Sequence, residues 1–219
     1  MLLLLYSRVI GYCNVLRWGL IFRLLMLLSP IIVILLGSLI AGFFRLNVEL
    51  TTRIVFIVSI IVAGLLDLIA LLLLFKGFKW AYGIHGFLVC RLASLFAIVL
   101  LFFSVISTVT IVYFMIIYPA TTYGFITRFV PGSLLIELVC LLLIVVGEVV
   151  IYRAFISLGI ANNSSLLVNG GYIGIASVFA YAFIRLIELL EAASIVLSIL
   201  AHLLLIMGLS KIISQYKVK

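Results

Sequence analysis

Charged residues are scarce in this sequence. Lysine, arginine, aspartate and glutamate make up 9% of the 219 residues, whereas they make up about a quarter of a typical soluble domain. So few charges do not cover the surface that a soluble fold of this length exposes to water. Because 68% of the residues are hydrophobic, the expected surroundings of the protein are lipid, and a soluble globular domain is excluded.

Cysteine and proline are also few, with 3 residues each, and the 16 glycines are no more than the usual share. These numbers exclude disulfide scaffolds, collagen and low-complexity chains. Cys13, Cys90 and Cys140 form no CxxC pair and have no metal-ligand spacing, so they are interpreted as small apolar residues. We expect no bound metal and no cofactor.

A dense run of basic residues is missing, although the formal net charge is +8. Lysine and arginine stand singly or in pairs between apolar stretches, where they anchor helices and contact anionic headgroups. Nucleic acid is therefore excluded as a partner, because a phosphate-binding face needs clustered basic residues. The expected partner is the lipid bilayer.

Four apolar stretches are each long enough to cross the ~30 Å of hydrocarbon in a bilayer. They are continuous and do not alternate with polar residues, which excludes a β-barrel. The four predicted spans cover residues 24–44, 54–75, 92–118 and 132–152.

The last third of the chain allows two interpretations. Residues 172–207 are almost wholly apolar, and only Arg185, Glu188 and Glu191 interrupt them, with no glycine or proline among the three charges. The segment is either two spans or one very long helix. The two-span interpretation places the spans at about residues 172–190 and 192–210.

The distribution of basic residues favours six spans over five. With six spans and a cytoplasmic N-terminus, ten basic residues lie inside and four outside, which satisfies the positive-inside rule. Five spans move the three C-terminal lysines outside and make the numbers equal. We therefore predict a multi-pass protein of the cell membrane with both termini in the cytoplasm.

Residues 1–23 carry Arg8, Arg17 and Trp18 among apolar residues, and they begin with four leucines after Met1. A secretory signal begins with charges and ends with small residues, so this segment is expected to be retained as an interfacial helix. The predicted fold is an all-α transmembrane bundle of six spans over residues 24–212, followed by a cytoplasmic tail at 213–219. Five spans are the alternative.

Polar side chains predicted deep in the bundle are the candidates for function. Asp67 lies past the middle of the second span, His202 is near the centre of the last, and Ser104, Ser107 and Thr108 form an i, i+3, i+4 stripe in the third. An aspartate near a histidine is typical of a proton relay, and the hydroxyls extend this to a small cation site. The alternative is a protonated Asp67 that only joins helices.

Other charges are expected near the ends of the spans. Glu148 is placed near the cytoplasmic end, within reach of Arg153 or water. Arg185, Glu188 and Glu191 are predicted to form an acidic patch at the outer surface, with one ion pair and one carboxylate left over.

Small residues at four-residue spacing predict close helix packing. They are Gly37, Ser38, Ala41 and Gly42 in the first span and Gly170 and Gly174 at the start of the fifth.

Enzyme motifs are missing. The sequence has no HExxH, no GxSxG and no phosphate-binding GxxxxGK[ST]. His85 is expected in a loop, so it does not match the depth of His202 for a bis-histidine haem. We therefore expect a protein that is not an enzyme.

Three stretches of the last third are similar to a known pattern. The sequence YRAFISLG at 152–159, then NSSLL at 163–167 with two glycines at 170–171, and GLSKI at 208–212 resembles uncharacterised archaeal multi-pass membrane proteins, a family whose domain has no known function. The segment with Arg185, Glu188 and Glu191 departs from that pattern, because it makes the apolar run longer than one span. The resemblance implies an archaeal source, and it implies no activity and no functional residues.

The sequence therefore predicts a structural or accessory subunit of a larger membrane assembly or of a homo-oligomer. The alternative is a small proton- or cation-coupled transporter or channel that uses Asp67 and His202.

Overall fold

The computed structural model describes residues 2–44, 48–117, 133–183 and 189–217, and within these ranges every regular element is a helix. The helices are α1 (Leu2–Phe44), α2 (Val48–His85), α3 (Leu88–Ile117), α5 (Ser133–Ala161), α6 (Ser165–Ala182) and α7 (Leu189–Lys217). All six of these described helices are long and apolar enough to cross a membrane. The prediction of an all-α, multi-pass bundle is confirmed.

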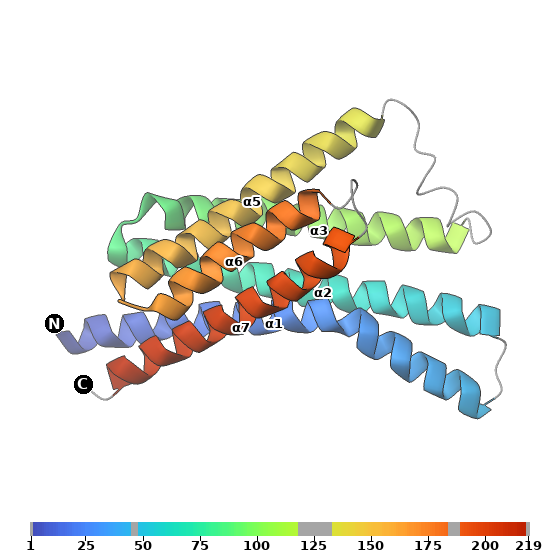
Figure 1. The fold of residues 1–219 in the computed structure, drawn as a ribbon, viewed down its shortest axis with the longest axis horizontal. Coiled ribbons are helices and arrows are strands. Elements are labelled where there is room, and N and C mark those ends of the chain that lie inside the picture. Colours follow the sequence, from blue (N-terminus) through green and yellow to red (C-terminus); the bar gives the residue numbers. More distant parts are fainter. Residues whose placement is uncertain (1, 45–47, 118–132, 184–188, 218–219) are drawn as a thin grey trace.

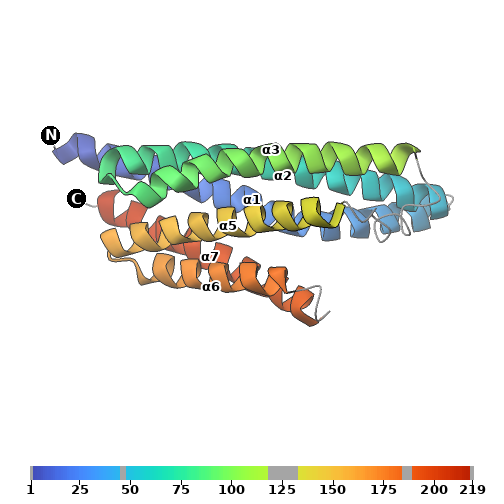
Figure 2. The same ribbon diagram turned by 90° about the horizontal axis from the view of Figure 1, so that it is seen from above.

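The helices run up and down in a closed ring. Each one packs against its neighbours in the chain, and α7 returns to pack against α1. Helices α1–α3 form one side of the bundle and α5–α7 the other (Figure 2). Both termini lie at the same end as the α2–α3 and α5–α6 connections (Figure 1).

The last third of the chain forms two helices and not one. Helix α6 ends at Ala182, α7 begins at Leu189, and the two pack side by side as an antiparallel hairpin. The six-span interpretation is therefore the one that the fold follows. Arg185 and Glu188 lie outside the described residues, and so does the side chain of Glu191.

The first segment differs from the prediction. Residues 2–23 do not form a separate interfacial helix, because α1 continues without a break to Phe44 and its first half is packed in the core. The fully buried side chains of Tyr12, Leu16 and Leu20 hold it there. Apolar residues lie between Arg8, Arg17 and Arg23 at helical spacing, and burying them favours one long helix over a surface segment.

The core fills the half of the bundle that holds the termini. Phe78 of α2 and Phe155 of α5 are fully buried and meet edge to face, with ring centroids 5.0 Å apart. At the end of the bundle, the hydroxyl of Tyr12 hydrogen-bonds Nε2 of His85 at 2.9 Å. His85 is thus the last residue of α2 and not part of a loop.

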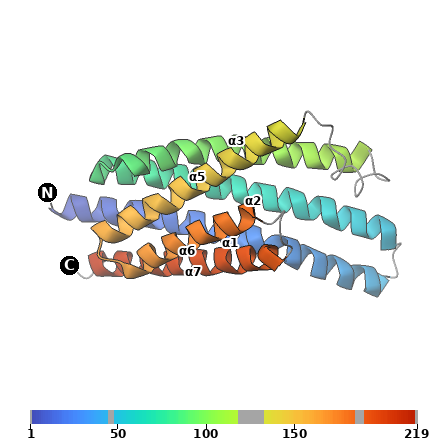
Figure 3. The same ribbon diagram turned by 45° about the horizontal axis from the view of Figure 1, so that its top comes forward.

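In the other half of the bundle, α1, α2 and α3 extend beyond the described ends of α6 and α7 (Figure 3). Pro30 lies inside α1, and the second half of the helix bends away from the direction of the first (Figure 1). Proline removes a backbone hydrogen bond and clashes with the preceding turn, which explains a bend. From Ile31 to Ile40, Gly37 is the one residue that is buried.

Candidate functional site

Arg23 of α1 forms the centre of a buried cluster of charges. Its residue is only 8% exposed, and both terminal nitrogens bond the carboxylate of Glu148 in α5. Nη1 donates to Oε2 at 2.6 Å, and Nη2 donates to Oε1. Two parallel bonds between a guanidinium and a carboxylate are among the strongest polar contacts in proteins.

Asp67 of α2 approaches the same guanidinium from another side. Its Oδ1 lies 3.8 Å from Nε of Arg23, which is an ion pair but too long for a hydrogen bond. Both atoms are buried and have no hydrogen-bond partner. Ser104 of α3 supplies a side-chain hydrogen bond to the Asp67 carboxyl group. Four helices therefore contribute to one polar cluster.

His202 of α7 borders this cluster, with Arg23 and Glu148 as its charged neighbours. The residue is 2% exposed, and its Nδ1 lies 2.7 Å from the carbonyl oxygen of Ser198. A carbonyl oxygen only accepts, so Nδ1 carries the hydrogen and Nε2 has the lone pair in the neutral ring. Nε2 is buried without a partner.

Tyr152 of α5 packs against the imidazole ring of His202. Its ring meets that of His202 edge to face, with centroids 6.3 Å apart, and its side chain hydrogen-bonds Ser177 of α6 and Ser198 of α7. The tyrosine is itself buried. It thus connects α5, α6 and α7 beside the charged cluster.

The cluster lies halfway along the bundle. Arg23 is the middle residue of α1, and the other members lie within two residues of the midpoints of α2, α3, α5 and α7. Asp67 stands nine residues before Lys76 and His202 nine residues before Lys211, which is ~14 Å at the rise of an α-helix. Half of the hydrocarbon thickness is ~15 Å, so basic residues at the bundle end place the cluster near mid-membrane depth.

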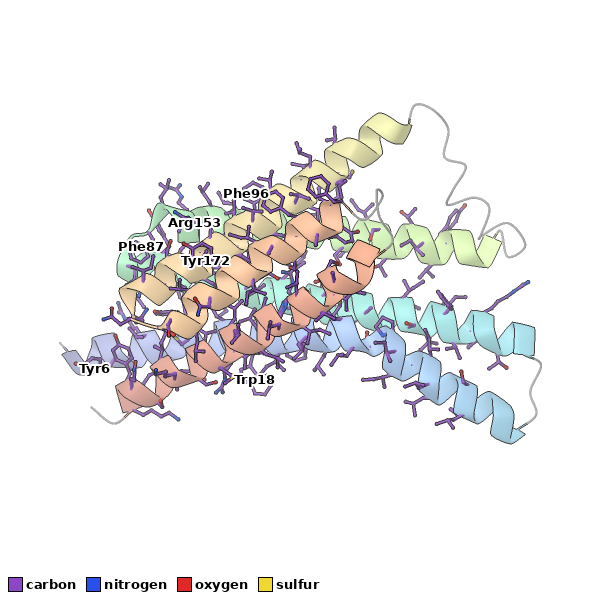
Figure 4. The ribbon with its side chains drawn as sticks, in the orientation of Figure 1. Tyr6, Trp18, Phe87, Phe96, Arg153 and Tyr172 are labelled. Carbon is purple, nitrogen blue, oxygen red and sulfur yellow. The ribbon has the colours of Figure 1, made fainter. Side chains whose placement is uncertain are left out.

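Two charges therefore differ from the sequence-based interpretation. Arg23 is not an anchor at the cytoplasmic end, and the carboxylate of Glu148 bonds Arg23. Arg153 is exposed and lies nearer the end that holds the termini (Figure 4). Because residues 2–23 were interpreted as a surface helix, Arg23 was expected at a helix start. The signal that points to its depth is the apolar run on both sides of it.

The polar stripe of α3 is only partly brought to the cluster. Ser104 faces Asp67, Thr108 packs against Gly64 of α2, and Ser107 is exposed on the outside of the bundle. The contacts of the described residues include no bond between Asp67 and His202, and Nδ1 of His202 is bonded to the carbonyl of Ser198 in its own helix. They have the Arg23–Glu148 pair as a common neighbour.

The predicted packing residues have different surroundings. Gly37 lies against Val55 of α2, Gly170 against Leu205 of α7, and Gly174 against Tyr152 of α5. Gly42 has no atom nearby, and Ser38 is exposed and bonds the carbonyl of Ile34. The side chain of Ala41 lies outside the described part of the chain.

A hollow of about 440 Å³ opens between α2 and α3, next to the cluster. Its wall includes Leu68, which follows Asp67 in the chain, and Thr108, one turn beyond Ser104, and it extends as far as Tyr113. Most of its lining side chains are apolar, and neither Asp67 nor Ser104 is among them.

No protein-family model, curated protein or solved structure matches this chain. The resemblance to archaeal membrane proteins stays a prediction. Among the described side chains, no group of three or more His, Cys, Asp and Glu is placed to hold a metal ion. The charged cluster of Arg23, Asp67 and Glu148, with Ser104 and His202 beside it, is therefore the candidate site of this membrane protein.

Proposed function

We propose that this protein is a small transporter or channel in which protons, or small cations exchanged against protons, bind at the charged cluster. One observation carries the proposal: Arg23, Asp67, Glu148 and His202 come from four helices and meet halfway along them, where Arg23 and His202 are buried and the side chains of Asp67 and Glu148 are only 17% and 14% exposed. Ionisable side chains at the centre of a bilayer cost free energy. Well-packed apolar residues in their place are often as stable or more so, so packing alone does not account for the cluster.

The charges in the cluster select the class of ligand. Two carboxylates face one guanidinium, so the ionised cluster has one negative charge in excess. The buried atoms without partners include Oδ1 of Asp67 and Nε2 of His202, which both accept protons. A positively charged ligand balances this excess, whereas an anion increases it.

Flux through purified protein in liposomes tests this proposal. We expect the protein to dissipate a pH gradient, read by a dye inside the vesicles, much faster than empty liposomes do. Asp67→Asn is expected to slow this flux by about a hundredfold, because a positioned proton acceptor contributes 10²–10⁴-fold to proton transfer.

Ser107→Ala is the matched control, because Ser107 is three residues from Ser104 but faces outward. It is expected to leave the flux unchanged. Flux equal to that of empty liposomes under proton, sodium and potassium gradients would contradict the proposal, and so would full flux in Asp67→Asn.

A structural or accessory role is the second candidate, and it is favoured by the uncovered half of α1. Leu35 and Leu39 are 60% and 70% exposed, and between Ile31 and Ile40 only Val33 and Gly37 are not exposed. A second copy of the chain, packed against this half of α1, would cover the exposed leucines.

Disulfide crosslinking in membranes tests this self-assembly. Leu35→Cys is expected to give a crosslinked dimer. Leu88→Cys, which is similarly exposed at the start of α3, is expected to give none. A monomer by light scattering, with no crosslink at Leu35, would exclude self-assembly at this face.

A further inference from the structure

The two carboxylates of the cluster are not equivalent. Glu148 accepts two hydrogen bonds from Arg23, so its charge is paired within the bundle. Asp67 accepts none from Arg23, and its Oδ1 faces the one guanidinium nitrogen that also has no hydrogen-bond partner. The charges of Arg23 and Glu148 thus cancel each other, and the remaining negative charge of the ionised cluster belongs to Asp67.

The groups around Asp67 supply no second positive charge. Helix α1 contributes Arg23, whose terminal nitrogens are bound to Glu148, and α3 contributes the hydroxyl of Ser104. Helix α5 contributes the carboxylate of Glu148, which repels a second carboxylate. Helix α7 contributes His202, beside Arg23 and Glu148, with its hydrogen on Nδ1. An ionised Asp67 therefore has only a long contact to a shared guanidinium.

A proton fits this place better than a metal cation. Metal cations that prefer oxygen take several oxygen ligands, and here the guanidinium of Arg23 occupies the space between the two carboxylates with its own positive charge. A proton needs only one oxygen of Asp67. The resulting neutral carboxyl group keeps its hydrogen bond with Ser104, and the cluster then has no net charge.

We propose that Asp67 is the proton-binding carboxyl group of the cluster, and that Nε of Arg23 hydrogen-bonds it each time the proton leaves. The O–H bond of Asp67 breaks, the proton passes to water or to Nε2 of His202, and the guanidinium keeps all of its own hydrogens. The 3.8 Å gap between Nε and Oδ1 then closes by less than 1 Å to reach hydrogen-bond distance. This inference rests on the proposed function, because it names the residue that binds the transported proton.

Infrared spectroscopy of the purified full-length protein tests the assignment without any flux. A protonated carboxylic acid has a C=O stretching band that a carboxylate lacks, and the band shifts in D₂O. We expect this band at neutral pH in the wild type, and we expect it to disappear on raising the pH. It should be lost in Asp67→Asn, where the amide still hydrogen-bonds Ser104, and kept in Glu137→Gln, which removes another carboxyl group from α5.

The outcomes separate the two proposals. A band that persists in Asp67→Asn, a band lost in Glu137→Gln, or no band in the wild type overturns the assignment to Asp67. A band that belongs to Asp67 in a protein without flux supports this assignment and refutes transport. If Asp67→Asn loses the band but keeps the flux, transport through Asp67 is refuted, whereas the assignment of the band to Asp67 stands.

Discussion

Arg23→Met is expected to destabilise the protein by about 3–5 kcal/mol, because it leaves Glu148 and Asp67 buried without their positive partner. Methionine fills much of the space of the arginine stem, so the loss reports the charge and not a cavity. The unfolding transition of the purified protein in detergent measures this loss, and size-exclusion chromatography checks that the variant elutes as a single species.

Two variants control this prediction. Arg153→Met removes an exposed arginine from α5, five residues after Glu148, and is expected to change stability by less than about 0.5 kcal/mol. The double variant Arg23→Met with Glu148→Met is expected to recover at least half of the loss, because an apolar pair replaces a buried ion pair at little cost. If the double variant is no more stable than Arg23→Met, the two side chains are not coupled, and the central place of their ion pair is refuted.

The helices were predictable because lipid offers no hydrogen-bond partners, so the backbone groups of each span must bond within the span. Long apolar runs indicate such spans. The break between α6 and α7 followed from the charges at 185, 188 and 191, although no glycine or proline marks it. The helix ends were less predictable. Helix α1 begins 22 residues before its predicted first residue, and α2 ends 10 residues after its predicted last residue, because arginine and lysine were treated as the limits of spans.

The cluster was half predictable, for a physical reason. Asp67 stood out because an acid surrounded by apolar residues must have a partner, and Ser104 was expected at its depth. Its charged partner was not found, because Arg23 pairs with Glu148, 125 positions away, and no local spacing encodes that contact. Identifying such a pair from one sequence requires the packing of α1 against its neighbours, which the apolar pattern does not specify.

Glycine packing shows the same limit. Gly37 and Gly42 follow the same small-residue spacing in α1, yet Gly37 is buried against α2 and Gly42 has open space around it. Gly208 of α7 was outside the predicted set, although it makes one of the closest approaches between helices. Spacing identifies faces that permit close packing, and the neighbouring helix decides which of them is used.

Gly208→Leu is therefore expected to separate α6 from α7. A Cβ atom at this position would lie 2.9 Å from the backbone nitrogen of Leu167 and 2.8 Å from its Cγ, and Leu167 is fully buried. Backbone at that distance does not move without shifting α6, so we expect a loss of at least about 1–3 kcal/mol, as for other overpacked sites. The unfolding transition in detergent measures it.

Gly42→Leu is the matched control for this last substitution, because no atom lies within 4 Å of a Cβ built there. It is expected to be neutral or to stabilise α1 by up to about 1 kcal/mol, since leucine has a higher helix propensity than glycine. The contrast between the two variants isolates close packing from helix propensity, which favours leucine at both positions. Equal stability of the two variants would show that α6 and α7 do not approach each other at Gly208.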